Sequence, residues 1–325
     1  MTDYGHELSF GLSLNPTADA LEETRRLAHR ADDDGLDYLA VQDHPYQPGY
    51  LETWTLISHL SAVTNRISFL TDVADLQLRP PTMLAKAATS LSILTDGRVQ
   101  LGVGGGAFAD AIASMGGLPR RGAEMVAFTE ESLLLMHQAL AGGVVRMQTP
   151  HHAVTGYRAG PVASAPVQLW LGAQKPKMLA VTGRAADGWI SPLNIYVPPE
   201  EVPARQQIID EAATAAGRDP RSIRRVYNVI GTIGAHGAGP GLVGDVQVWA
   251  DTLSDWALRL GFDTFIFWPV GDAEAQLEIF SSHVVPARTR AAAGWTCRGP
   301  CWPVAAPSPW CSASPRRRAT GGVRA

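Results

Sequence analysis

Two adjacent titratable residues, Asp43 and His44, directly follow the short apolar run 38–41. The run has the composition of a buried strand, and Pro45 ends it because proline has no backbone N–H to donate. A carboxylate beside an imidazole at a strand end is suited to general acid–base catalysis. The alternative is that Asp43 caps a turn and His44 is an ordinary surface residue. The pair by itself leaves both interpretations open.

A second group with possible chemistry is the turn Gly172-Ala173-Gln174-Lys175-Pro176-Lys177. Its small residues let the backbone approach a ligand, and a helix beginning there would offer free N–H groups. Of the three lysines in the chain, two lie in this turn. We therefore predict that the turn binds a phosphate group.

A glycine run, Gly104, Gly105 and Gly106, follows another apolar stretch. Glycines of this kind allow close approach of a ligand to the backbone, and they also allow a helix to approach a sheet. The run lacks the third glycine of a dinucleotide fingerprint, since Ala107 stands in that place. On its own it is a weak signal.

Strands and helices that alternate along the chain must position these groups. The sequence predicts eight strands, each followed by a helix, at residues 10–14, 37–41, 66–73, 98–103, 167–172, 188–191, 225–233 and 263–268. Strands joined by crossover helices are parallel, and eight such units close as a (β/α)8 TIM barrel rather than a doubly wound sheet. Residues 144–165 form either a long loop or a short hairpin. We expect one barrel domain over residues 1–293.

The functional face of such a barrel is the end where the strands run into their following loops. We expect four residues of this face to line a substrate pocket: Asn15, Trp54, Phe108 and Trp268. The aromatic side chains could form walls for a flat ligand, although core packing is the alternative for each of them.

A catalytic metal is not expected. Barrel metallohydrolases gather several His and Asp side chains at strand ends. Here the first strand ends in Asn15-Pro16, and the pair His151-His152 lies within residues 144–165, away from any strand end. His44 alone cannot hold such a metal.

Composition excludes several other classes of protein. A net charge of -4 and a pI near 6.1 give no case for binding nucleic acid or an anionic membrane. No apolar run reaches the roughly 18 residues that span a bilayer, and the first residues do not form a secretory signal. We expect a cytoplasmic protein that acts on a small molecule, and a homodimer.

The final segment, residues 294–325, differs in composition from the rest. It contains all three cysteines, Cys297, Cys301 and Cys311, together with five arginines and no acidic residue. The cysteine spacing is not that of a zinc site. We interpret the segment as a disordered tail with the composition of an out-of-frame or read-through end.

Four separated segments resemble the bacterial luciferase-like flavin and deazaflavin oxidoreductases, and the resemblance covers about residues 8–290. The segments are Tyr38-Leu-Ala-Val-Gln-Asp-His-Pro45, residues 66–73 with 78–86, Leu91-Ser-Ile-Leu-Thr-Asp-Gly-Arg-Val-Gln-Leu-Gly-Val-Gly-Gly-Gly106, and residues 169–173 with Gly183-Arg-Ala-Ala-Asp-Gly-Trp189. The third and fourth segments together are fairly specific to this family. The tail does not resemble the family.

The resemblance implies a barrel that binds coenzyme F420 or FMN across its C-terminal face. An Asp-His pair after the second strand is typical of the F420 branch, which implies His44 as a proton donor near the ring. Asp43 would orient His44 or keep it protonated. Residues 172–177 would contact the cofactor phosphate, and residues 104–106 would flank the cofactor chain.

The family resemblance also implies a non-proline cis peptide at the end of the third strand, among Thr71, Asp72 and Val73. Asp72 and Val73 would then lie against the cofactor.

The implied reaction is hydride transfer between F420 and a small organic substrate, with the protein supplying orientation and a proton. The alternative with FMN is a two-component monooxygenase that activates oxygen and depends on a separate reductase. A second alternative is a flavin-binding barrel without catalytic activity.

Overall fold

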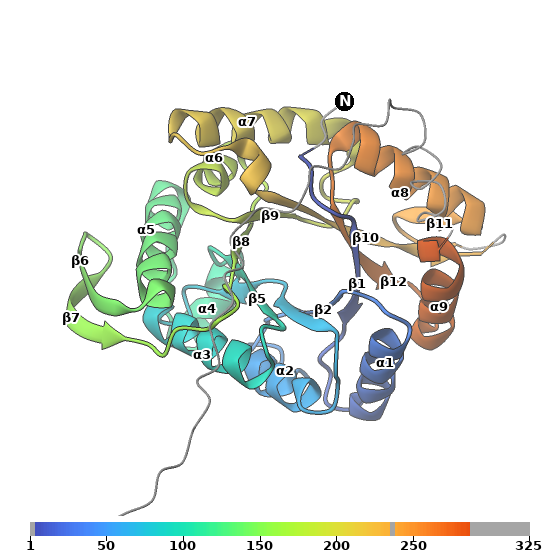
Figure 1. The fold of residues 1–325 in the computed structure, drawn as a ribbon, viewed down its shortest axis with the longest axis horizontal. Coiled ribbons are helices and arrows are strands. Elements are labelled where there is room, and N and C mark those ends of the chain that lie inside the picture. The colour runs from blue at the N-terminus through green and yellow to red at the C-terminus, as the bar shows by residue number, and fades with distance from the viewer. Residues whose placement is uncertain (1–3, 235–237, 287–325) are drawn as a thin grey trace, which may run out of the picture.

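The computed structural model describes residues 4–234 and 238–286, and within them eight parallel strands close into a barrel (Figure 1). The barrel strands are β1 (Ser9–Leu14), β2 (Tyr38–Val41), β3 (Ser68–Thr71), β5 (Val99–Gly104), β8 (Leu169–Gly172), β9 (Gly188–Ser191), β10 (Arg224–Ile233) and β12 (Thr264–Pro269). Closure occurs because β10 pairs with both β9 and β12, and β12 pairs with β1. The predicted TIM barrel is confirmed. The predicted tail, residues 294–325, lies outside the described residues.

Helices between the strands form the outer ring of the barrel (Figure 1). They are α1 (Leu21–Asp33), α2 (Thr53–Ser61), α3 (Pro81–Leu94), α5 (Gly122–Ala141), α6 (Pro176–Ala185), α7 (Val202–Ala215), α8 (Val246–Leu260) and α9 (Ala273–Ile279). Local sequence explains several of their ends. Pro81 and Pro176 occupy first helical positions, where the missing N–H is not needed. Gly261 ends α8 in the left-handed conformation that glycine adopts freely.

Shorter elements extend this plan, and most of them were not predicted. They are β4 (Ala74–Asp75), α4 (Ala109–Ser114), β11 (Leu242–Gly244), the 3-10 turns Pro199–Glu201 and Pro220–Ser222, and a π-helical turn Phe280–Val284. Residues 143–159 form a hairpin of β6 (Gly143–Gln148) and β7 (Ala153–Ala159), which overlaps the predicted segment 144–165 and which Figure 1 shows beside α5. The hairpin alternative is therefore the correct one for this segment.

The hydrophobic core has two parts. The larger part lies between the strands and the surrounding helices. The smaller part fills the barrel interior with Ala40, Leu70, Trp170, Ile190, Val226 and Ile266, against which Tyr38, Val73 and Trp268 pack. Because side chains alternate along each strand, one face of a strand packs in the barrel and the other against helices. The filled interior leaves the ends of the barrel for function.

Helices α6 and α7 pack closely at Gly183. A Cβ atom on this glycine would lie 2.3 Å from the Ile209 carbonyl oxygen and 2.8 Å from the Ala213 nitrogen, both on α7. We predict that Gly183→Ala lowers the free energy of unfolding by about 1–3 kcal/mol, because backbone atoms cannot move aside cheaply. Chemical denaturation measures the change. Gly49→Ala is the control, since no atom lies within 4 Å of its added Cβ. Equal unfolding midpoints for the two variants would contradict the prediction.

Candidate active site

A mainly apolar cavity of about 750 Å³ lies at the carboxyl end of the barrel strands. It is bordered by the ends of β2, β3, β5, β8 and β9 and by the loops that follow them. Most of the predicted site residues line it: Asp43, His44, Asp72, Val73, Gly104, Gly105, Gly106, Phe108, Gly172, Ala173, Gln174, Lys175 and Lys177. Barrel closure thus brings the three separately predicted groups around one space, at the face where barrel enzymes hold their active sites.

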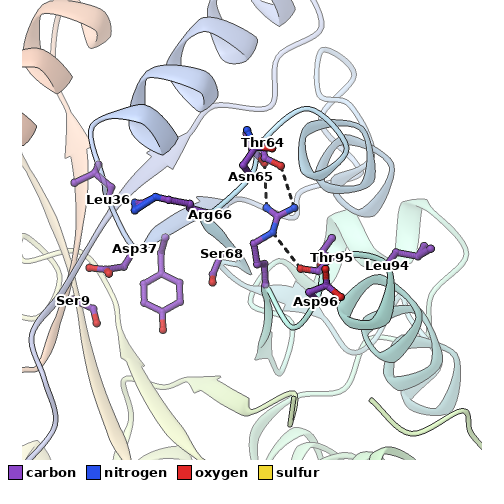
Figure 2. Close-up of a pocket in the computed structure, with 12 residues that line it drawn as sticks. Ser9, Leu36, Asp37, Thr64, Asn65, Arg66, Ser68, Leu94, Thr95 and Asp96 are labelled. Carbon is purple, nitrogen blue, oxygen red and sulfur yellow. Dashed lines mark hydrogen bonds between the residues drawn. The ribbon is translucent and has the colours of Figure 1, made fainter. Parts of the chain in front are cut away.

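A second pocket of about 640 Å³ lies at the opposite end of the barrel, at the start of β2, β3 and β5 (Figure 2). Arg98 lines this pocket, and its guanidinium donates to the carbonyl oxygens of Thr64 at 3.1 Å and Thr95 at 3.2 Å. It also donates to the Ile67 carbonyl oxygen at 2.9 Å. Arg98 is therefore occupied in joining loops at this end, and the cavity at the carboxyl end is the better functional site.

Three residues that were expected in the substrate pocket do not line this cavity. Asn15 is exposed in the loop after β1. Trp54 lies on α2 and packs against the outer part of the core. Trp268 packs inside the barrel, where its indole Nε1 donates to Asn228 Oδ1 at 2.9 Å. The sequence placed each of these residues at the correct end of the barrel. It did not give the direction of the side chains, which depends on local backbone geometry.

The carboxylate of Asp43 does not hydrogen-bond to His44. Its two oxygens accept from Arg79, at 2.8 Å from Nε and 2.7 Å from Nη2, and Oδ2 also accepts from the Asp75 backbone N–H at 3.1 Å. Arg79 reaches Glu52 as well, at 2.6 Å. Arg79 therefore occupies both oxygens of the Asp43 carboxylate, and no direct hydrogen bond joins Asp43 to His44.

Burial favours the neutral form of the His44 imidazole. Burial lowers its pKa below the ordinary value of 6.5, and the nearby charge of Asp43 only partly opposes this shift. The charge of Asp43 thus favours the protonated imidazole, and burial, which is the larger effect, opposes it. His44 Nδ1 lies 2.7 Å from the Tyr46 hydroxyl, and the ring packs edge-on to Phe108 at a centroid distance of 5.5 Å. Nε2 has no hydrogen-bond partner in the described part of the chain and is available to a ligand.

The end of β3 contains the expected cis peptide, between Asp72 and Val73. Val73 then lies against two glycines of neighbouring strands. A Cβ atom on Gly104 would lie 2.6 Å from Val73 Cγ2, and one on Gly172 would lie 3.2 Å from both Val73 methyl carbons. Glycine at these positions therefore makes room for the Val73 side chain on the cavity wall.

Asp72 is a buried carboxyl group with few partners. Asn228 Nδ2 donates to its Oδ1 at 3.3 Å, and its Oδ2 has no partner among the described residues. Burial raises the pKa of Asp72 from 3.8 to about 7, because an ionised carboxylate is poorly solvated there.

The turn after β8 presents positive charge at the cavity edge. Lys175 and Lys177 are exposed on either side of Pro176, which begins α6. Gln174 anchors the turn by donating from Nε2 to the Tyr196 carbonyl oxygen at 3.0 Å. Lysine ammonium groups beside a helix N-terminus form an arrangement suited to binding a phosphate.

Sequence reasoning missed Arg79, Tyr46 and Asn228. Arg79 lies in a segment already noted for its family resemblance, and an arginine just before Pro80 at the start of a helix was an available signal. Asn228 is a polar residue within the apolar strand 226–230, which marks it as unusual. Neither signal indicates which residue is the partner. For Asn228, the partner Asp72 lies 156 residues away along the chain.

Within residues 4–234 and 238–286, no three His, Cys, Asp or Glu side chains are grouped to hold a metal ion. Among these same residues, no helix is both long and apolar enough to cross a membrane.

We predict that Arg79→Met lowers the free energy of unfolding by about 3–5 kcal/mol, because it leaves Asp43 buried without a counter-charge. The Asp43 side chain has no exposed surface. Urea denaturation measures the loss, and adding Asp43→Asn should restore much of it. Arg121→Met is the matched control, since Arg121 pairs with Asp110 on the exposed surface. The prediction fails if the Arg79 and Arg121 variants unfold at the same urea concentration.

Two curated relatives show the range of similar sequences. The chain is 31% identical over 182 residues to a phthiodiolone/phenolphthiodiolone dimycocerosates ketoreductase of Mycobacterium tuberculosis, covering 53% of this chain and 45% of that protein. It is 29% identical over 219 residues to the 5,10-methylenetetrahydromethanopterin reductase of Methanolobus tindarius, covering 66% of this chain and 63% of that protein. The chain thus spans about half the length of the first of these relatives.

Solved structures share the fold. An F420-dependent secondary alcohol dehydrogenase in complex with an F420-acetone adduct superposes with a TM-score of 0.78 at 15% identity, over 87% of this chain and 99% of the other. The oxygenating constituent of 3,6-diketocamphane monooxygenase from Pseudomonas putida, in complex with FMN, gives a TM-score of 0.70 at 17% identity, over 86% and 99%.

The sequence family described as luciferase-like monooxygenase matches residues 3–236, which is most of the barrel. The match covers the ends of β2, β3, β5, β8 and β9, which border the cavity. The chain therefore belongs to the luciferase-like monooxygenase family.

Proposed function

We propose that this protein is an F420-dependent oxidoreductase, which transfers a hydride between coenzyme F420 and a small organic substrate. The observation that carries the proposal is that one apolar cavity joins a neutral imidazole, His44, to the lysine-bearing turn at residues 174–177. A cofactor with a flat ring and a phosphate tail matches this combination.

Two features of the cavity fit such a cofactor. The glycine positions beside Val73 make a close-packed wall for a planar ring. Lys175 and Lys177 lie at the edge, where a phosphate would remain partly solvated.

The relatives favour a reductase or dehydrogenase reaction. One is named a ketoreductase and another a reductase, and a protein of the same fold is an F420-dependent secondary alcohol dehydrogenase. The ketoreductase and alcohol dehydrogenase names support a carbonyl or alcohol carbon as the reacting centre of the substrate.

F420, when bound, takes up or supplies the hydride. The chain's own contribution is proton transfer and orientation. In the oxidising direction, His44 Nε2 accepts the proton that leaves the substrate hydroxyl as the hydride leaves the carbon. In the reducing direction, the imidazolium returns that proton to the carbonyl oxygen. A neutral His44 is ready to accept a proton at pH 7, and Tyr46 at Nδ1 holds the ring in place.

FMN is the alternative cofactor, supported by the FMN complex of a monooxygenase with the same fold. With FMN, the protein would be the oxygenating component of a two-component system and would depend on a separate flavin reductase. A flavin-binding barrel without activity is the remaining alternative. Titrating the protein with F420 and with FMN, followed by fluorescence, separates these proposals. Tighter binding of FMN, or binding of neither compound, would overturn the F420 proposal.

We predict that His44→Gln lowers kcat about 100-fold or more, because glutamine cannot transfer the proton. The dissociation constant of the cofactor should change little, since the apolar wall and the lysine turn are intact. Steady-state kinetics and a fluorescence titration give the two values. Near-normal turnover by the variant would remove His44 from the mechanism.

We also predict that Lys175→Ala with Lys177→Ala weakens cofactor binding about tenfold or more, since charged hydrogen bonds to a phosphate are lost. The loss should shrink at high salt, where these exposed charges are screened. Lys86→Ala is the matched control, because Lys86 contacts the Gly160 carbonyl oxygen and does not line the cavity. An equal loss in the control variant would refute a specific role for the turn.

A further inference from the structure

The end of the cavity beside His44 has an aromatic wall that the proposed reaction leaves without a role. Phe108 lines the cavity, and its ring lies edge-on to the His44 ring at a centroid distance of 5.5 Å. The Tyr46 ring lies 5.9 Å from Phe108 and 5.5 Å from His44. Three rings thus meet at the site of proton transfer, and a molecule bound at His44 lies against the other two.

Phe108 reaches this place because the segment after β5 turns back toward the end of β2. Gly106 adopts a φ of 85°, which glycine does without strain. Gln77 is buried and holds the turn, donating from Nε2 to the Gly105 carbonyl oxygen at 2.5 Å. Its Oε1 accepts from the Arg120 backbone N–H. These bonds fix the backbone just before Phe108.

Phe108 has apolar surface to offer a ligand. It is 55% exposed, although it is a large apolar residue in a cavity wall. A hydrocarbon group that covers this ring gains the free energy of removing both apolar surfaces from water. Ala107, Met125 and Val126 extend the same apolar lining. This end of the cavity is therefore suited to a hydrocarbon group.

The charges at this end do not suit an anionic substrate. Asp43 is paired with Arg79, and its side chain has no exposed surface. Asp75 is buried, and its Oδ1 accepts from the Gln77 backbone N–H at 2.8 Å. Among the described residues, the cavity lining contains no arginine, and its two lysines lie in the turn after β8. An anion beside His44 would meet two carboxylates and no free cation.

Strand order separates this end of the cavity from the lysine turn. His44 follows β2 and the lysine turn follows β8, and β3 and β5 stand between these two strands in the sheet. Val73 and Gly104, at the ends of β3 and β5, form the wall between them. If the cofactor phosphate binds at the lysine turn, as proposed above, the space beside Phe108 is left for the substrate.

We propose that Phe108 and Tyr46 bind an apolar substituent of the substrate, which is an uncharged ketone or secondary alcohol carrying a hydrocarbon group. The inference rests on the proposed function, which puts the reacting oxygen atom at His44 Nε2. Both rings lie beside the imidazole, so a group attached to the reacting carbon contacts them. Phe108 thus selects the substrate and takes no part in proton transfer.

The first test measures kcat/KM with reduced F420 for methyl ketones from butanone to octan-2-one. Each methylene that becomes buried should raise kcat/KM by up to about fourfold. Phe108→Ala should lower the value for octan-2-one about tenfold or more, and should lower it less for butanone. Leu118→Ala, a change at a residue that is 74% exposed and does not line the cavity, should follow wild type. No increase along the series in wild type, or equal losses for short and long ketones in Phe108→Ala, would overturn the proposal.

A second comparison tests the charge of the substrate. Laevulinate has the chain of pentan-2-one but ends in a carboxylate, and 4-aminobutan-2-one ends in an ammonium group. Both should give a kcat/KM about tenfold or more below that of pentan-2-one, because the charge would be buried against the aromatic wall without a partner. If either charged compound equals pentan-2-one, the uncharged substrate class is wrong.

A binding measurement separates this inference from the proposed function. The ring ¹H–¹³C NMR signals of His44 and Phe108, assigned with His44→Gln and Phe108→Ala, are followed as octan-2-one is added. The protein is used without cofactor and with F420 or FMN, whichever binds. We expect both signals to shift, and Phe108→Ala to bind the ketone more weakly. If the ketone shifts both signals but F420 transfers no hydride to it, the proposed function fails and the apolar site stands. No shift in any of these forms would overturn the site.

Discussion

Closure of the parallel sheet is the constraint on which the rest of this structure depends. Backbone groups of each barrel strand pair on both sides, and β10 completes the circle by pairing with β9 and β12. All the strands point the same way, so every strand end that carries a functional residue opens on one face. Asp72 meets Asn228 across the barrel interior for this reason, although 156 residues separate them. The cavity is a consequence of closure.

Two acidic residues of the cavity, Asp43 and Asp72, differ in their electrostatic surroundings. Asp43 is fully buried and is matched by a bidentate arginine, so it serves as a fixed ionic link between the β2 end and the start of α3. Asp72 has no cation, and burial raises its pKa to about 7. The barrel mouth therefore holds an ion-paired carboxylate, an acid whose pKa is raised by burial and an imidazole whose pKa is lowered by burial. Neighbouring titratable groups with shifted pKa values are common at sites of proton transfer.

The proposed function gives a role to each group that lines the cavity. Val73 and the glycines supply a flat wall, the lysine turn supplies charge at the edge, and His44 supplies the proton site. Membership of the luciferase-like monooxygenase family supports a flavin or deazaflavin cofactor. A homodimer remains a prediction, as do the cytoplasmic location and the dependence on a separate reductase.

The sequence by itself determined the barrel and the location of its functional end, because strand and helix periodicity is local and parallel connection follows from it. It also identified most residues of the cavity, since they lie where apolar runs end. Only the tertiary structure decided their partners. Asp43 bonds to Arg79 rather than to His44, and Trp268 turns into the barrel toward Asn228. Such pairings depend on side-chain direction and on contacts between distant strands, and no local pattern encodes them. The sequence could not indicate the pKa shifts of His44 and Asp72 either, because burial exists only in the folded chain.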